Sequence, residues 1–295
     1  MKFNDKYGYV PGEDIAGKLQ NFAGNLDVIA CPEVFRQCFS FMDLTTLHGN
    51  DTEASVRKLV DKVTTLVRER PGYPLPASIC VYPNFASVVR EHRCSEELHV
   101  TTVAGCFPSS QSFTDVKVVE CEMAVQNGAD EVDIVLSLGD FLSGNEEKAF
   151  GEICAIRKAV DLAGIQEGRK IILKVILETG LLVSPELIAE ASLLAMEAGA
   201  DFIKTSTGKV DVNATPAAAY VMCQCIGLFA GKTGRKVGFK AAGGISNAMD
   251  ALGYYSIVSG LLGSEWLDKK LFRFGVSRLG NSLMSAIEQS NVNFF

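Results

Sequence analysis

The hydrophobic and polar positions of this chain follow two alternating patterns. Short apolar runs rich in Val, Ile and Phe are typical of strands, and each is followed by a turn and a longer stretch with helical spacing. The predicted strands are residues 40–45, 77–82, 99–105, 131–136, 170–178, 202–205, 237–241 and 271–274. The predicted helices are residues 53–68, 85–91, 112–127, 146–163, 185–198, 215–229, 246–262 and 277–289, with residues 137–144 as a loop.

These units alternate strictly, and no strand-strand hairpin signal separates them. Strands that alternate with helices form βαβ units and a parallel sheet. Eight such units favour one closed (β/α)8 barrel, a TIM barrel, over a doubly wound open sheet. The first predicted strand is not followed by the Gly-x-Gly-x-x-Gly pattern of a dinucleotide-binding fold. We therefore expect an α/β chain with a helical N-terminal extension over residues 1–39 and the barrel over residues 40–295.

Composition limits the class of protein. A chain of 295 residues with 47% hydrophobic and 21% charged residues is typical of a soluble protein with a large core. Its net charge of −7 argues against a surface for nucleic acid or anionic membranes. Nine cysteines without a Cys-x-x-Cys pair favour free thiols and a cytoplasmic location, and neither a signal peptide nor a membrane span is evident. Three histidines without a His-x-x-x-His pair argue against a zinc hydrolase.

Charged residues interrupt the predicted strands near their carboxyl ends, where barrel enzymes place their chemistry. They are Asp43, Asp133, Lys174, Glu178, Lys204 and Lys240. Buried like charges must be offset, and the two aspartates can offset two of the three lysines. The third amine is then able to be neutral. The register of each strand is open at this point, so these charges could also point outward and pair with helices.

Lys204 follows an apolar run and precedes Thr205-Ser206-Thr207-Gly208-Lys209. Burial lowers the pKa of an amine and frees its lone pair, which makes a lysine nucleophilic toward carbonyl compounds. A neighbouring Lys240 would lower that pKa further, because a like charge disfavours the protonated form. We therefore expect Lys204 to form a Schiff base. The alternative is a strand-end lysine whose ammonium group reaches solvent.

Glycine-rich segments follow the last three predicted strands. Gly243-Gly244 and Gly275-Val276-Ser277 occupy the loops that many barrels use to bind phosphate. Thr207-Gly208-Lys209 could add a hydroxyl group and a cation. These glycines could also be ordinary turn residues between strands and helices.

Six segments together resemble the deoxyribose-phosphate aldolase family. They are Asp43-Leu44-Thr45-Thr46-Leu47, Ala129-Asp130-Glu131-Val132-Asp133, Leu173-Lys174-Val175-Ile176-Leu177-Glu178-Thr179-Gly180, Asp201-Phe202-Ile203-Lys204-Thr205-Ser206-Thr207-Gly208-Lys209, Val212-Asn213-Ala214-Thr215-Pro216 and Val237-Gly238-Phe239-Lys240. The resemblance implies a class I aldolase on a (β/α)8 barrel, with no metal or other cofactor. Its reaction would be the reversible cleavage of 2-deoxy-D-ribose 5-phosphate to D-glyceraldehyde 3-phosphate and acetaldehyde, in deoxyribonucleoside catabolism. Its partner would be a small phosphorylated sugar, not nucleic acid or a membrane, and a homo-oligomer stays open.

The resemblance also implies roles for individual residues. Lys204 would be the Schiff-base lysine, Lys240 the neighbour that lowers its pKa, and Asp133 the acid/base group. Asp43, Lys174 and Thr205 would belong to the substrate pocket. The phosphate-binding positions would be Thr207, Gly208, Lys209, Gly243, Gly244 and Ser277.

The chain departs from the family pattern at three places. Ala241 follows Lys240 where proline is frequent, Arg278 follows Ser277 where a second hydroxyl is frequent, and Phe295 stands where some members carry a terminal tyrosine. Three other functions share parts of the pattern. They are a class I aldolase or transaldolase for another phosphorylated sugar, a non-catalytic sugar-phosphate binder, and a phosphate-binding barrel isomerase.

Overall fold

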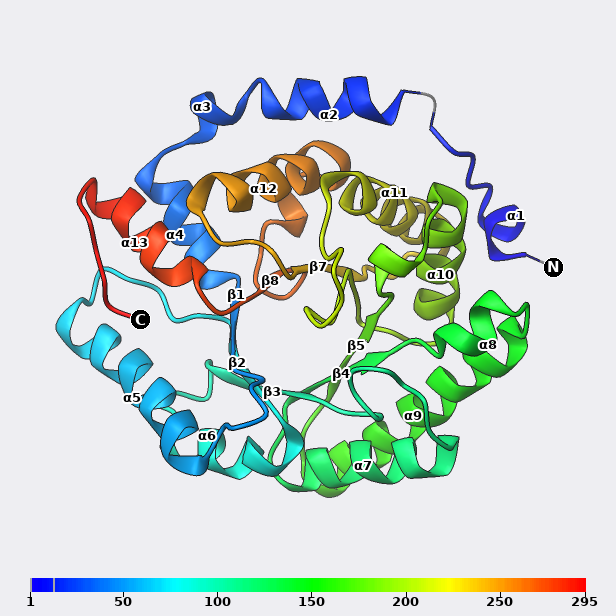
Figure 1. The fold of residues 1–295 in the computed structure, drawn as a ribbon, viewed down its shortest axis with the longest axis horizontal. Coiled ribbons are helices and arrows are strands. Elements are labelled where there is room, and N and C mark those ends of the chain that lie inside the picture. The colour runs from blue at the N-terminus through cyan, green and yellow to red at the C-terminus, as the bar shows by residue number, and fades with distance from the viewer. Residues whose placement is uncertain (1, 13) are drawn as a thin grey trace.

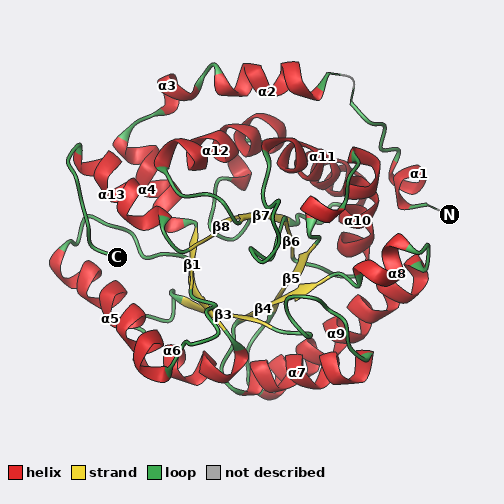
Figure 2. Ribbon diagram, in the orientation of Figure 1, coloured by secondary structure: helices red, strands yellow, loops and turns green. Residues whose placement is uncertain are grey.

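A computed structural model describes residues 2–12 and 14–295. Eight parallel strands follow one another in sequence order around a closed barrel, and β1 pairs with β8 to complete it (Figures 1 and 2). The strands are β1 Met42–Thr45, β2 Ser78–Val81, β3 His99–Val103, β4 Glu131–Val135, β5 Ile172–Ile176, β6 Phe202–Lys204, β7 Gly238–Ala242 and β8 Phe272–Val276. The predicted (β/α)8 barrel is therefore confirmed, and the open sheet is excluded.

Helices surround the barrel and connect successive strands (Figure 2). The outer ring consists of α5 Glu53–Glu69, α6 Ala86–His92, α7 Thr114–Gln126, α9 Glu146–Gln166, α10 Pro185–Glu197, α11 Pro216–Thr233, α12 Ala248–Leu262 and α13 Leu279–Glu288. Short 3₁₀ helices lie at Pro83–Phe85, Thr179–Leu181 and Ser264–Trp266. The predicted loop over residues 137–144 was wrong, because it contains the helix α8, Leu138–Leu142. Burial of Phe141 anchors α8, and one turn is too short to show a helical period.

Side-chain caps fix where several helices begin. Thr52 caps α5 by accepting from the Ser55 amide at 3.1 Å, and the Ser55 hydroxyl accepts from the Thr52 amide at 2.9 Å. Thr215 accepts from the Ala218 amide at 3.1 Å, directly before the proline that begins α11. These contacts satisfy amides that lack a partner in the first helical turn. The caps place the strand-to-helix loops, which carry the candidate site.

The described residues before β1, 2–12 and 14–41, include four helices along one side of the ring (Figure 1). They are α1 Phe3–Tyr7, α2 Ile15–Ala23, α3 Leu26–Ile29 and α4 Pro32–Ser40. Glu190 of α10 accepts from the amides of Phe3 and Asn4 at 2.6 and 2.8 Å, which ties α1 to the barrel. The predicted helices at residues 15–22 and from Pro32 are present. Ser40 ends α4 and does not begin β1, so the proposed division at residue 39 cuts the last turn of this helix.

The apolar core lies between the strands and the surrounding helices, where residues such as Val132, Leu173 and Phe239 are fully buried. All nine cysteines are free thiols. Within the described part of the chain, no helix combines the length and apolar character needed to cross a bilayer. The interior of the barrel differs from this core, because charged side chains fill it.

Candidate active site

The barrel interior holds a cluster of charged side chains that the sequence spreads over six strands. Among the described residues it consists of Asp43 on β1, Glu131 and Asp133 on β4, Lys174 on β5, Lys204 on β6, Lys240 on β7 and Arg273 on β8. All seven are buried, and Lys204 is the most exposed at 4%. Asp133 is the register partner of Lys174, and Lys204 is that of Lys240. The five aspartates and lysines singled out from the sequence therefore meet inside the barrel.

Asp133 lies at the centre of this cluster. Its Oδ1 accepts from Lys174 Nζ at 2.8 Å, and its Oδ2 accepts from Lys204 Nζ at 2.9 Å and from Lys240 Nζ at 2.8 Å. Burial alone would raise the pKa of Asp133, but the three amines outweigh it and hold the pKa well below its usual range. Asp133 is therefore ionised near neutral pH and able to accept a proton.

The three lysines differ in their pKa. Burial lowers the pKa of Lys204, Asp133 opposes the shift and Lys240 adds to it, so the pKa ends below its ordinary value. Burial has the same direction at Lys174 and Lys240, but their carboxylate partners outweigh it and raise both pKa values. Lys204 is thus the amine that loses its proton most readily, which is the property a Schiff-base nucleophile needs.

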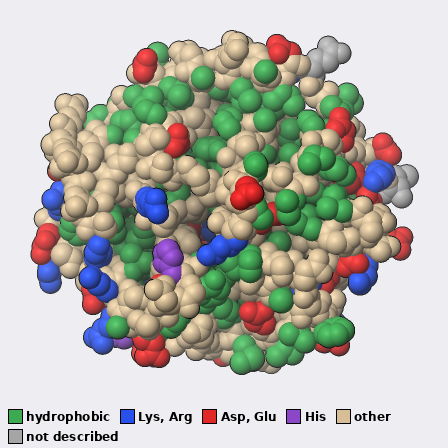
Figure 3. All heavy atoms as spheres, viewed as in Figure 1, with side chains coloured by type: hydrophobic (Ala, Val, Ile, Leu, Met, Phe, Trp, Pro, Cys, Tyr) green, Lys and Arg blue, Asp and Glu red, His purple; other side chains and the backbone are tan. Residues whose placement is uncertain are grey.

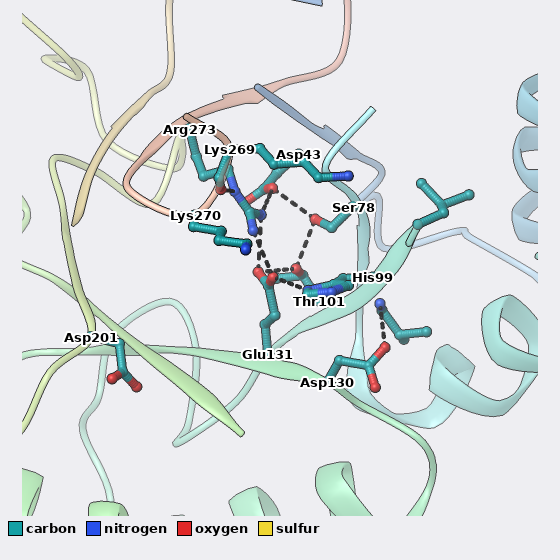
Figure 4. A network of polar contacts seen from close by, with 12 residues as sticks. Asp43, Ser78, His99, Thr101, Asp130, Glu131, Asp201, Lys269, Lys270 and Arg273 are labelled. Atoms are coloured by element: carbon teal, nitrogen blue, oxygen red, sulfur yellow. Dashed lines mark hydrogen bonds and ion pairs between the residues drawn. The ribbon is translucent and has the colours of Figure 1, made fainter. Parts of the chain in front are cut away.

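Arg273, Glu131 and His99 form a lower layer of the cluster that was not predicted from the sequence (Figure 4). Arg273 Nη1 donates to Asp43 Oδ1 at 2.6 Å, and its Nη2 donates to Glu131 Oε1 at 2.8 Å. Glu131 also lies 2.5 Å from Lys174 Nζ and 2.6 Å from the ring nitrogen Nδ1 of His99. One signal was available, since Glu131 is two positions from Asp133 and so shares its face of the strand. Arg273 interrupts the apolar run Leu271–Phe274 in the same way.

A cavity of about 250 Å³ opens above Lys204 at the carboxyl ends of the strands. Every residue expected to bind phosphate lines it: Thr207, Gly208, Lys209, Gly243, Gly244 and Ser277. Thr45 and His48, which had no expected role in binding, line it as well. Figure 3 shows Lys or Arg side chains and a His beside the central hollow. A larger hollow of about 650 Å³ between α2 and α12 is lined mostly by apolar residues. The smaller cavity contains the candidate nucleophile Lys204 and the cation of Lys209, so it is the better candidate for a substrate site.

The backbone around this cavity needs glycine. Gly208, Gly243 and Gly244 have φ values of 80°, 84° and 81°, in the left-handed region that other residues rarely adopt. A Cβ atom at Gly243 would also lie 2.6 Å from the side chain of Asn213. Lys209 Nζ donates to the Leu47 carbonyl at 2.6 Å, which draws the loop after β6 toward the loop after β1. The cavity wall thus combines glycine backbone, the hydroxyl residues Thr45, Thr207 and Ser277, and the cation of Lys209.

Two of the residues noted in the sequence take part in backbone contacts instead. The Thr205 hydroxyl donates to the Ala242 carbonyl at 3.2 Å and accepts from the Ala242 amide at 3.0 Å, which ties β6 to β7. Glu178 accepts from the Thr207 amide at 3.1 Å and from the Thr207 hydroxyl at 2.5 Å. Neither residue lines the cavity, and both hold the loop that carries Thr207 and Lys209.

The three departures from the family pattern lie outside the cavity lining. Ala241 is buried in the core, and Arg278 is exposed at the start of α13. Asn281 of α13 accepts from the amides of Phe294 and Phe295 at 2.7 and 2.8 Å, so the last residues lie against α13. Among the described residues, no group of three His, Cys, Asp or Glu side chains is arranged to hold a metal ion.

Comparison with known proteins gives a consistent result. The family model described as "DeoC/LacD family aldolase" matches residues 38–252. A Caenorhabditis elegans protein, provisionally named a deoxyribose-phosphate aldolase, is 39% identical over 269 residues, which cover 90% of this chain and 86% of that protein.

Solved structures agree with the sequence matches. A deoxyribose-phosphate aldolase from Aeropyrum pernix, described as tetrameric, superposes with a TM-score of 0.66 and is 26% identical, covering 90% of this chain and 95% of its own. A Coccidioides immitis protein, provisionally given the same name, has a TM-score of 0.68 and 25% identity, with 92% and 96% coverage.

Proposed function

This chain belongs to the DeoC/LacD family of aldolases, and from that premise we propose that it cleaves 2-deoxy-D-ribose 5-phosphate reversibly through a Schiff base on Lys204. The products are D-glyceraldehyde 3-phosphate and acetaldehyde, a step of deoxyribonucleoside catabolism. The observation that carries the proposal is the position of Lys204. Its amine has a lowered pKa, contacts Asp133 and lies at the floor of a cavity with a glycine-lined wall.

The first half of the proposed cycle forms a covalent intermediate. The neutral amine of Lys204 attacks C1 of the open-chain sugar, and loss of water gives an iminium ion. Asp133 then accepts the proton of the C3 hydroxyl, and the C2–C3 bond breaks with its electron pair moving toward the iminium nitrogen. D-Glyceraldehyde 3-phosphate leaves, and an enamine of acetaldehyde remains on Lys204.

The second half returns the proton. The enamine takes a proton at its terminal carbon from the acid form of Asp133, directly or through a water molecule, and becomes an iminium ion again. Water then adds to this iminium ion and releases acetaldehyde and the free amine. Lys240 donates to Asp133 Oδ2 at 2.8 Å in the free protein, which favours the ionised carboxylate at the start of each cycle. No side chain of the described tail is required as a proton donor.

The phosphate group is proposed to bind between the loops after β6, β7 and β8. The lining of the cavity supports this placement, because Gly243 and Gly244 leave the backbone open to an anion and Lys209 adds a cation. Binding there would hold C1 of the sugar against the amine of Lys204, and such positioning lowers the barrier by up to about 7–11 kcal/mol in well-oriented reactions.

Trapping with borohydride tests the proposal. We expect acetaldehyde and borohydride together to inactivate the protein and to add one ethyl group to Lys204, which peptide mass spectrometry would locate. Dihydroxyacetone in place of acetaldehyde is expected to leave Lys204 unmodified, which separates this activity from that of other class I aldolases. A barrel isomerase or a non-catalytic binder would give no adduct. An adduct on another lysine would disprove the role of Lys204.

A Lys209→Met substitution tests the phosphate site separately. We expect KM for the phosphorylated sugar to rise roughly 10- to 100-fold, since a hydrogen bond to a charged group contributes about 1.5–3 kcal/mol. Lys209→Arg retains the cation and serves as the matched control. Steady-state kinetics with 2-deoxyribose, which has no phosphate, should be nearly unchanged in both variants. An equal loss with both sugars would show that Lys209 acts by holding the Leu47 carbonyl instead.

Two wider expectations remain proposals. The Aeropyrum pernix relative is described as tetrameric, which supports self-association of this chain. A cytoplasmic location is consistent with the nine free thiols.

A further inference from the structure

The buried charges inside the barrel do not cancel. Among the described residues, the cluster contains three carboxylates, Asp43, Glu131 and Asp133, and four cationic side chains, Lys174, Lys204, Lys240 and Arg273. Three of the cations can be matched by the three carboxylates. A fourth buried charge without its own counter-ion is unfavourable. One cation is therefore driven to lose its proton, and it must be a lysine, because a guanidinium group stays protonated in proteins.

Contacts within the cluster decide which lysine is left over. Lys174 lies within 3.5 Å of Asp43, Glu131 and Asp133, and Lys240 contacts both Asp43 and Asp133. Of the carboxylates in the described part of the chain, Lys204 pairs only with Asp133, at 2.9 Å, and it shares that carboxylate with two other amines. Lys204, at the floor of the cavity, is thus the lysine that has no carboxylate of its own, and it is the one expected to lose its proton.

Arg273 is the fourth cation, and Figure 4 shows it beside Asp43 and Glu131. Its Nη1 and Nη2 donate to the two carboxylate oxygens of Glu131 at 3.1 and 2.8 Å, and Nη1 also donates to Asp43 Oδ1 at 2.6 Å. Its Nε donates to the Lys269 carbonyl, and its guanidinium lies 5.5 Å from the centre of the Phe202 ring. Phe202 fits there because Gly238 has no side chain, and a Cβ at Gly238 would lie 2.3 Å from that ring. Arg273 is therefore held in one place and is 2% exposed.

We propose that Arg273 is a positioning residue for the charge state of Lys204: it neutralises Glu131 and part of Asp43, so that these carboxylates do not hold Lys204 in its charged form. The proposal rests on the function proposed above, since it assigns a cause to the reactivity of the same lysine. This role differs from a structural one, because it depends on the positive charge of Arg273 and not only on how its side chain packs. The lowered pKa of Lys204 agrees with this.

Other ionisable groups surround Lys204, and the test must keep them constant. They are Asp43 of β1, Cys80 of β2, His99 of β3, Asp133 and Glu131 of β4, Lys174 of β5, Lys240 of β7, and His48 and Lys209 at the mouth. His99 contacts Glu131 and is partly exposed. The variants below leave all of these groups unchanged except Glu131.

The experiment measures the rate of reductive ethylation of Lys204 by acetaldehyde and cyanoborohydride as a function of pH, with mass spectrometry to locate the adduct. For Arg273→Met we expect the midpoint of this profile to rise by about one pH unit, the lower end of what a nearby charge causes. Adduct formation on the acid side of the midpoint should then fall about tenfold. Glu131→Gln removes a carboxylate and should lower the midpoint. The double variant should return it toward the wild-type value.

Arg273→Lys is the matched control, because it keeps the charge and loses the planar fork; its midpoint should stay near that of the wild type. Thermal unfolding checks that each variant is folded. If Arg273→Met does not fold, Glu131→Gln and the double variant give the same comparison, and the double variant must have the higher midpoint. A slower reaction with an unmoved midpoint would overturn the proposal. A wild-type protein that forms no adduct on Lys204 would instead overturn the proposed function.

Discussion

A Lys204→Arg variant is expected to lose at least about 10⁴-fold in turnover of 2-deoxy-D-ribose 5-phosphate, because removal of the nucleophile from a covalent protease costs roughly 10⁶ in kcat. The guanidinium group stays protonated and forms no Schiff base. It also places a permanent cation beside Asp133, which Lys204 contacts at 2.9 Å, where the count of buried charges favours a neutral amine. The variant should therefore unfold at a lower temperature than the wild type, and steady-state kinetics with borohydride trapping, below that temperature, would measure the loss.

A second buried lysine provides the control for this substitution. Lys117 of α7 is 1% exposed and donates to Glu152 at 2.6 Å, outside the barrel interior. A Lys117→Arg variant makes the same chemical change in a similarly buried place, and it should keep the adduct on Lys204. Turnover by Lys204→Arg within tenfold of the wild type would rule out the covalent mechanism. A comparable loss in both variants would indicate damage to the fold.

An Asp133→Asn variant is expected to reduce turnover by about 10²- to 10⁴-fold, the usual contribution of a general acid–base group. The amide cannot accept the proton of the C3 hydroxyl. Its loss of charge also removes the group that opposes the lowered pKa of Lys204. The amine should then be neutral at lower pH than in the wild type, so the rate loss should persist across the whole pH profile of kcat.

Asp43→Asn is the matched comparison for Asp133→Asn. Asp43 is equally buried and contacts Lys240 and Arg273, but it has no contact with Lys204. Breaking a buried ion pair typically costs about 3–5 kcal/mol of stability, so both variants should unfold at lower temperature. We expect the larger loss of kcat in Asp133→Asn. Equal losses of kcat would place the acid–base role elsewhere in the cluster.

Local sequence patterns were sufficient for the order and type of most elements. The apolar runs marked the eight strands, and prolines such as Pro185 and Pro216 marked helix starts, because a first-turn position needs no amide donor. Boundaries were less accurate where tertiary contacts decide them. Ser40, predicted as the first residue of a strand, is the last residue of α4. The helix α8 lies in a predicted loop and depends on burial of Phe141. The glycines after β7 were recognised because a left-handed φ leaves little choice of residue.

The sequence by itself determined that three lysines and two aspartates interrupt strands of one barrel, and that glycine-rich loops follow the last three strands. Only the tertiary structure decided which groups face one another, because strand register and barrel closure bring together residues far apart in the chain. Lys204 and Asp133 are separated by 71 positions, and Arg273 and Asp43 by 230. Those contacts bring Glu131 and Arg273 into the cluster. Once both are included, the buried cations outnumber the carboxylates by one, and Lys204 is left without a carboxylate of its own.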